Sequence, residues 1–143
     1  MSKFSQNLPK IAVIGFLALG IFIIINKSFD SDDKATQVAV VIPELSIVAK
    51  EGEELFNANC ASCHGRNVAG TKQGPTLIHD IYNPGHHADE GFFRAAKFGV
   101  RAHHWSFGNM PPIDIEKNDV ARIIQYIREL QVANGIATKK HTM

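Results

Sequence analysis

The chain holds only two cysteines, Cys60 and Cys63, and a histidine, His64, follows the second one directly. This C-x-x-C-H spacing is typical of covalent haem attachment. Each thiol can form a thioether with one of the two neighbouring vinyl groups of haem, and the histidine then lies against one face of the ring, where its nitrogen can bind iron. Because the motif uses both cysteines, no disulfide can stabilise the fold. We therefore expect the haem to supply much of the core of this 143-residue chain.

Two other interpretations of the cysteine pair are weaker. A redox-active dithiol normally lies in a βαβ context, and no alternation of strand and helix patterns surrounds this pair. A structural zinc site usually needs four protein ligands, which would leave two of them to scattered histidines. The sequence therefore favours one covalently bound haem c as the cofactor.

The N-terminal segment is strongly apolar. Residues 11–25 are all apolar or glycine; lysines precede them, and mainly acidic residues follow. As a helix, residues 11–26 would span about 24 Å, less than the ~30 Å of a bilayer core. No small-x-small cleavage pattern follows Ile25 directly, so we expect residues 1–27 to be a retained signal-anchor rather than a cleaved signal peptide.

The charges beside the apolar segment predict its orientation. Lysines before it and mainly acidic residues after it place the N-terminus in the cytoplasm and the rest of the chain outside. In bacteria covalent haem attachment takes place on that outer side, so the two signals agree on a haem domain that is anchored in the inner membrane and lies in the periplasm. A soluble periplasmic protein, released by signal cleavage, is the alternative. The formal net charge of +1 gives no indication of a nucleic-acid partner.

The rest of the chain shows helical periodicity and no convincing strand alternation. Helices are predicted at about residues 47–59, 88–99 and 117–133, and Ser46 is a plausible N-cap of the first. The expected fold class is therefore all-α. The expected domains are residues 1–27 as signal-anchor or signal peptide, 28–45 as linker, 46–135 as haem domain and 136–143 as flexible tail.

These features resemble the class I, mono-haem c-type cytochromes of bacteria. The resemblance covers about residues 46–135 and rests on the C-x-x-C-H motif, on Gly-Pro-Thr-Leu at 74–77, on Asn-Met-Pro-Pro at 109–112 and on the amphipathic last helix. It implies the cytochrome c fold, with several helices wrapped around one covalent haem. It also implies an electron-transfer protein that is not an enzyme.

The resemblance further implies roles for particular residues. His64 would be the proximal and Met110 the distal iron ligand, and the carbonyl of Pro75 would accept a hydrogen bond from the ring N–H of His64. The first and last helices of the haem domain would cross, with Gly52 close to Tyr126.

The sixth iron ligand has several candidates in the sequence itself. Met110 is favoured because two prolines stiffen the loop after it, and because 46 residues separate it from His64, enough to reach the other haem face. A histidine ligand or an open position would instead suit a haem enzyme or a gas sensor. The competing histidines of the domain are His79, His86, His87, His103 and His104.

The expected partners are a redox donor and a redox acceptor, either membrane respiratory complexes or periplasmic dehydrogenases. Residues 46–135 hold nine Lys or Arg against ten Asp or Glu, so no lysine-rich docking face is evident. The apolar N-terminal segment adds the membrane as a partner. It is equally consistent with a haem subunit held permanently in a larger respiratory complex.

Overall fold

The computed structural model describes residue 13 and residues 15–23 and 37–136. The chain divides into two compact units, Met1–Asp33 and Lys34–Met143. In the first unit the described residues are helical and mostly exposed. None of the described helices is both long enough and apolar enough to cross a membrane. Most of the expected signal-anchor, half of the linker and nearly all of the tail lie outside the described residues.

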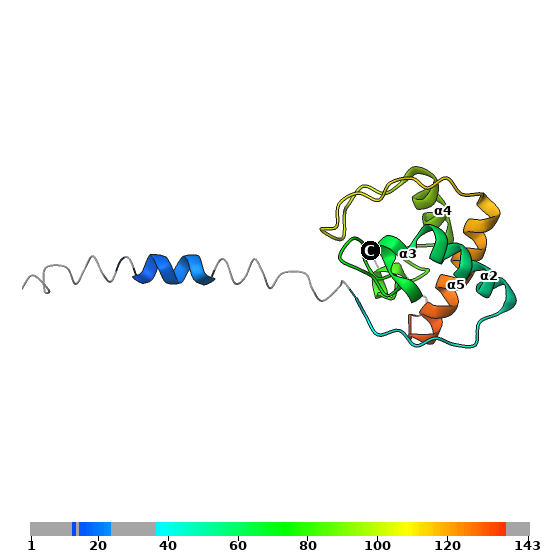
Figure 1. Ribbon diagram of the computed structural model, residues 1–143, viewed down its shortest axis with the longest axis horizontal. Coiled ribbons are helices and arrows are strands. Elements are labelled where there is room, and N and C mark those ends of the chain that lie inside the picture. The colour runs from blue at the N-terminus through cyan, green and yellow to red at the C-terminus, as the bar shows by residue number, and fades with distance from the viewer. Residues whose placement is uncertain (1–12, 14, 24–36, 137–143) are drawn as a thin grey trace, which may run out of the picture. The chain divides into compact units, whose positions relative to one another are not determined.

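The second unit is built from helices, as Figure 1 shows. The described part of the chain has no strand, only an isolated antiparallel bridge between Val100 and Met110. The expected all-α class is therefore confirmed. The elements of this unit are α2 (Ile47–Asn59), α3 (Ala61–His64), the 3-10 turns η2 (Arg66–Val68) and η3 (Asp80–Tyr82), α4 (Asp89–Phe98) and α5 (Lys117–Ala133).

The main packing contact is the crossing of α2 and α5, which lie side by side in Figure 1. Gly52 is buried at the crossing point, where a Cβ atom would clash with the carbonyl oxygen of Arg122 and lie 3.0 Å from the Cβ of Tyr126. One turn further along α2, the rings of Phe56 and Tyr126 pack with centroids 5.7 Å apart. The expected crossing near Tyr126 is confirmed, and it requires glycine because the two backbones touch.

A capping serine fixes the start of α2 against α5. The Ser46 hydroxyl accepts a hydrogen bond from the N–H of Ala49 at 3.2 Å, as an N-cap does. The same hydroxyl donates to Oε1 of Glu129 at 2.7 Å, and the Ser46 N–H donates to Oε2 at 3.0 Å. One residue therefore both caps the first helix of the domain and joins it to the last.

The core lies where α2 and α5 meet the chain that follows the cysteine motif. Its buried apolar residues come from positions up to 85 apart in the sequence, so the core joins the two ends of the domain. They are Leu45, Ala49, Phe56, Val68, Leu77, Ile123, Tyr126, Ile127 and Leu130.

The described part of the expected linker, residues 37–45, belongs to the second unit and is hydrogen-bonded to the rest of it. The N–H of Val38 donates to the carbonyl of Ala69 at 2.9 Å. The N–H of Val41 donates to Oδ1 of Asn134, and Nδ2 of Asn134 donates back to the carbonyl of Val41, both at 2.8 Å. Residues 37–45 thus run along this unit before α2 begins.

Candidate haem-binding site

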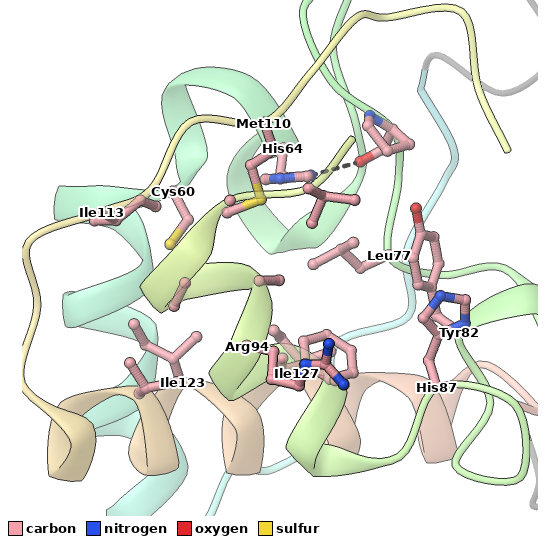
Figure 2. A pocket seen from close by; sticks show the side chains of 18 of the residues that line it. Cys60, His64, Leu77, Tyr82, His87, Arg94, Met110, Ile113, Ile123 and Ile127 are labelled. Carbon is pink, nitrogen blue, oxygen red and sulfur yellow. Dashed lines mark hydrogen bonds between the residues drawn. The ribbon is translucent and has the colours of Figure 1, made fainter. Parts of the chain in front are cut away.

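A cavity of about 490 Å³ lies between the cysteine motif, α4, α5 and the loop after α4. Figure 2 shows side chains from these segments around it. Its volume falls within the range of about 300–1,000 Å³ that is usual for cofactor sites. Its walls are mainly apolar and include Phe56, Leu77, Phe92, Ile113, Ile123 and Ile127.

The cysteine motif stands at one end of this cavity. Helix α2 ends at Asn59, and the N–H of Cys60 closes its last turn on the carbonyl of Phe56 at 2.8 Å. The single helical turn α3 then carries the rest of the motif. Cys60 and His64 line the cavity, whereas Cys63 is exposed and does not.

The Cys60 thiol is not activated in the way that a redox-active or zinc-binding cysteine would be. Burial and, to a smaller extent, the neighbouring Cys63 raise the pKa of Cys60 to about 11. Reactive and metal-binding cysteines instead need a lowered pKa, because the thiolate is the active form. Among the described residues, neither cysteine joins a group of three or more potential metal ligands.

The ring of His64 is held by a backbone acceptor. Nδ1 lies 2.9 Å from the carbonyl oxygen of Pro75, drawn as a dashed line in Figure 2. If Nδ1–H donates this bond, Nε2 keeps its lone pair, which is the arrangement usual for a metal-ligating histidine. Burial lowers the pKa of His64, an effect that the hydrogen bond to Pro75 partly opposes. The ring is therefore neutral at pH 7, the form that can bind a metal.

The segment that supplies this carbonyl is itself fixed. The N–H of Leu77 and the hydroxyl of Thr76 both donate to the carbonyl of Val68, at 2.9 and 3.0 Å. From α5, the buried Gln131 donates through Nε2 to the carbonyl of Leu77 at 2.9 Å. Residues 74–77 are thus held between the loop after the motif and the last helix.

Met110 reaches the same cavity from a different loop. Its backbone exchanges two hydrogen bonds with Val100, of 2.9 and 3.0 Å. Gly99 has a φ of +72°, and a side chain there would clash with the carbonyl of Met110. The N–H of Ile113 donates to the carbonyl of Ala96 in α4 at 2.8 Å. These contacts place Met110 in the cavity lining together with His64, and Figure 2 shows both side chains.

The competing histidines fall into two groups. His79 packs edge-on against Trp105, with ring centroids 5.1 Å apart, and its Nδ1 accepts a hydrogen bond from the N–H of Ile81. The other four form a cluster, three members of which also line the cavity. They are His86, His87, His103 and His104.

Two histidines of this cluster, His87 and His104, have a lowered pKa, which favours the neutral ring. Burial lowers the pKa of His87, and the nearby His86, His103 and Arg128 lower it further, against a hydrogen bond to Ile81 that raises it. Partial burial and the three neighbouring rings likewise lower the pKa of His104.

Several residues that line the cavity could not be assigned to the site from the sequence, because no motif includes them. Tyr82 lines the cavity and accepts a hydrogen bond from the indole N–H of Trp105 at 2.9 Å. Phe92 lines it too, with the guanidinium of Arg128 4.9 Å above its ring, and Arg94 joins them from α4. Only the tertiary fold brings these side chains to the motif.

The residues present fit a haem. A neutral imidazole, a thioether and a thiol all border one largely apolar cavity. Imidazole and thioether are both known iron ligands of haem, and an apolar wall suits the macrocycle. An all-α domain with this donor set defines the class of small haem-binding electron carriers.

The chain belongs to the cytochrome c family, whose model matches residues 49–131. This family consists of electron carriers rather than enzymes, and its membership implies a covalently bound haem c. The resemblance found in the sequence is thus confirmed.

Several curated bacterial proteins are similar to the chain. Cytochrome c-551 of Bacillus subtilis is 28% identical over 119 residues, which are 83% of this chain and 93% of that protein. The FixP subunit of a cbb3-type cytochrome c oxidase from Bradyrhizobium diazoefficiens is 28% identical over 102 residues, 67% of this chain and 34% of the subunit.

A shorter match links the chain to the cytochrome c subunit of the cytochrome bc1 complex from Mycobacterium leprae. It is 44% identical over 43 residues, which are 29% of this chain and 15% of that subunit. The chain therefore spans nearly the whole of the Bacillus protein, but only about a third of FixP and 15% of the bc1 subunit. No solved structure matches the chain significantly.

Proposed function

We propose that this protein carries single electrons on one haem c, which is attached through Cys60 and Cys63 and ligated by His64 and Met110. The observation that carries the proposal is the pairing of His64 and Met110 in the lining of one apolar cavity. The hydrogen bond of His64 to Pro75 supports it, because that bond orients the ring as a ligand.

The roles of the residues follow from their chemistry. When bound, the haem supplies an iron atom that alternates between the ferrous and ferric states. His64 presents a neutral nitrogen that a backbone acceptor holds in place. Met110 offers a thioether, which raises the reduction potential. The apolar walls exclude water, and the anchored loops limit movement of the two ligands between oxidation states.

The first experiment tests attachment and ligation together. The purified protein is denatured and extracted with acidified organic solvent, and the haem in each phase is measured. Haem that stays with the polypeptide supports attachment at Cys60 and Cys63, whereas haem that leaves with the solvent refutes it. A weak absorption band at the red end of the ferric spectrum, from sulfur-to-iron charge transfer, supports Met110; its absence favours a histidine or an open site.

We also propose that residues 1–27 anchor the protein in the inner membrane of a bacterium and that residues 46–135 form the haem domain on the periplasmic side. Residues 28–45 would link them, and residues 136–143 would form a tail. The uninterrupted apolar run and the charges beside it support this arrangement. Cell fractionation, with sequencing of the mature N-terminus, tests it; a soluble product that begins between Asn26 and Val40 would show cleavage instead.

The partners that we propose are a redox donor and acceptor of a respiratory chain. The similarity to FixP, a subunit of a cbb3-type oxidase, also supports a second candidate function, that of a haem subunit within a larger complex. Mild detergent extraction followed by native electrophoresis and haem staining distinguishes the two. A free carrier migrates alone, whereas a subunit migrates with a large complex.

A further inference from the structure

Four histidines from two separate loops meet at the rim of the haem cavity. His86 and His87 lie between η3 and α4, and His103 and His104 lie in the loop after α4. The rings of His103 and His104 are 4.1 Å apart between centroids, and those of His87 and His104 are 5.5 Å apart. Such a concentration of imidazoles is unusual for a domain that needs at most one or two for its haem.

Three of these side chains, those of His86, His87 and His104, bring potential ligand atoms close together. Their potential ligand atoms lie within 4.8 Å of one another. Tetrahedral coordination with metal–nitrogen bonds of about 2.0–2.1 Å requires separations of about 3.3 Å. His86 and His104 are exposed, so rotation of their side chains can close the difference without moving the core.

We propose that His86, His87 and His104 form a binding site for a divalent transition-metal ion, Zn²⁺ or Cu²⁺. Imidazole nitrogen is a preferred ligand of these ions. Three histidines leave a fourth position for water or an external ligand, as in open zinc sites. The site is distinct from the haem iron, because it uses neither of the proposed iron ligands, His64 and Met110, although His87 and His104 also border the haem cavity.

The hydrogen bonds around His87 suit a metal ligand. Its Nδ1 lies 2.6 Å from the carbonyl oxygen of Ile81, so Nδ1–H donates and Nε2 is left with a lone pair. Metal-ligating histidines almost always have such a backbone or carboxylate partner.

The backbone that carries the first two ligands is fixed in advance. The N–H groups of His86 and His87 both donate to the carbonyl of Asn83, at 3.0 and 2.8 Å. Asn83 is buried, and its Oδ1 accepts from the N–H of Gly85 at 2.8 Å. This turn fixes the backbone of His86 and His87 at the rim of the cavity. Binding of a metal ion would therefore have to order only the side chains of these two residues.

The charges around the cluster permit a cation. Arg128 places a positive charge beside His87, and its Nη2 donates to the carbonyl of His87 at 2.6 Å. Its Nε is paired with the carboxylate of Asp89 at 2.8 Å, which offsets that charge.

Titration of the haem-loaded protein with Zn²⁺ by calorimetry tests the proposal. The titration uses untagged protein in its haem-loaded form, so that neither a tag nor a free thiol competes with the histidines for zinc. We expect one ion per chain. His86→Ala and His104→Ala should each weaken binding by at least about tenfold, and the double variant should abolish it.

His79→Asn is the matched control. It removes a histidine outside the cluster and keeps a side-chain acceptor for the N–H of Ile81, so zinc binding should not change. The proposal is overturned if the wild-type protein binds no Zn²⁺ or if the double variant still binds it. A changed haem spectrum in His86→Ala would also overturn it, since His86 does not line the haem cavity and would then have to act at the iron. These outcomes are independent of the solvent-extraction test for covalent haem.

Discussion

The side chain of Met110 combines a flexible thioether with a rigid backbone. The bridge to Val100 and the two prolines that follow hold the main chain, while the side chain lines the cavity. A methionine in a core position is more often filler than a ligand. Met110 instead borders a cavity that also contains His64, which is the reason we propose it as an iron ligand.

Met110→Ala should open the sixth iron position to water or to a rim histidine. Carbon monoxide should then bind the ferrous protein readily, and the red charge-transfer band should disappear. Optical spectra with and without carbon monoxide measure both effects. An unchanged spectrum and unchanged carbon monoxide reactivity would show that Met110 is not the ligand, and His103 and His104 would be the next residues to replace.

Met110→His should keep the haem low-spin but lower its reduction potential. Two imidazoles donate more electron density to ferric iron than one imidazole and a thioether do, so the oxidised state gains more. The fall should be on the order of a hundred millivolts or more, well inside the range that axial ligands command. Redox titration measures it, and a potential equal to that of the wild type would contradict sulfur ligation.

Single residues also show what sequence can and cannot reveal about this site. Cys60, Cys63 and His64 are close together in the sequence, so their spacing alone predicts covalent haem attachment. Tyr82 and Phe92 became neighbours of the motif only through folding, and no local pattern marks them. The histidines could be read only as scattered candidates, since their clustering depends on two loops meeting.

Among the elements, α2 and α5 were predictable because their apolar periodicity and end signals agree. The observed bounds, Ile47–Asn59 and Lys117–Ala133, match the predicted ones. No apolar periodicity in the sequence marks the break between α2 and α3 at Cys60 or the two 3-10 turns. Their positions depend on the packing around them.

Gly52→Ala should destabilise the domain by about 1–3 kcal/mol, because a methyl group would collide with the α5 backbone at Arg122. Helix propensity alone predicts the opposite, a gain of up to about 1 kcal/mol. Urea unfolding of the haem-loaded protein measures the free energy of unfolding. Ala58→Gly, at an exposed position of α2, is the control for propensity. A higher free energy of unfolding for Gly52→Ala than for the wild type would contradict a tight crossing.

Ser46→Ala should destabilise the junction of α2 and α5 by about 1 kcal/mol at pH 7, since it removes an N-cap and a donor to Glu129. Partial desolvation raises the pKa of Glu129, but hydrogen bonds from Gln125 and Ser46 outweigh it and lower that pKa overall. A lowered pKa in the folded state adds stability above the pKa of the unfolded state, and this contribution disappears as the pH falls through the folded value.

The difference between wild type and Ser46→Ala should therefore shrink in acid, while the capping contribution remains. Urea unfolding at pH 7 and at pH 3–4 measures it. Ser46→Thr keeps the hydroxyl and should behave like the wild type. A difference that is the same at both pH values would show that the contact with Glu129 adds nothing.

For the molecule as a whole, the cavity dominates the energetics. An enclosed void in a protein core costs about 24 cal/mol per Å³, so about 490 Å³ would cost on the order of 12 kcal/mol if it were fully enclosed and left unfilled. That is comparable with the entire stability of a typical domain, about 5–15 kcal/mol. The helices alone cannot hold this cavity open, and the haem is thus part of the core.

The double variant Cys60→Ala with Cys63→Ala should consequently lose both covalent haem and cooperative folding. Haem staining after denaturing electrophoresis measures attachment, and circular dichroism during heating measures the unfolding transition. Ser62→Ala changes a position inside the motif that bears no thiol, so it should keep both properties. If the haem-free double variant still unfolds cooperatively near the wild-type temperature, the cavity must close without the haem, and the helices α2 and α5 would be sufficient to hold the domain together.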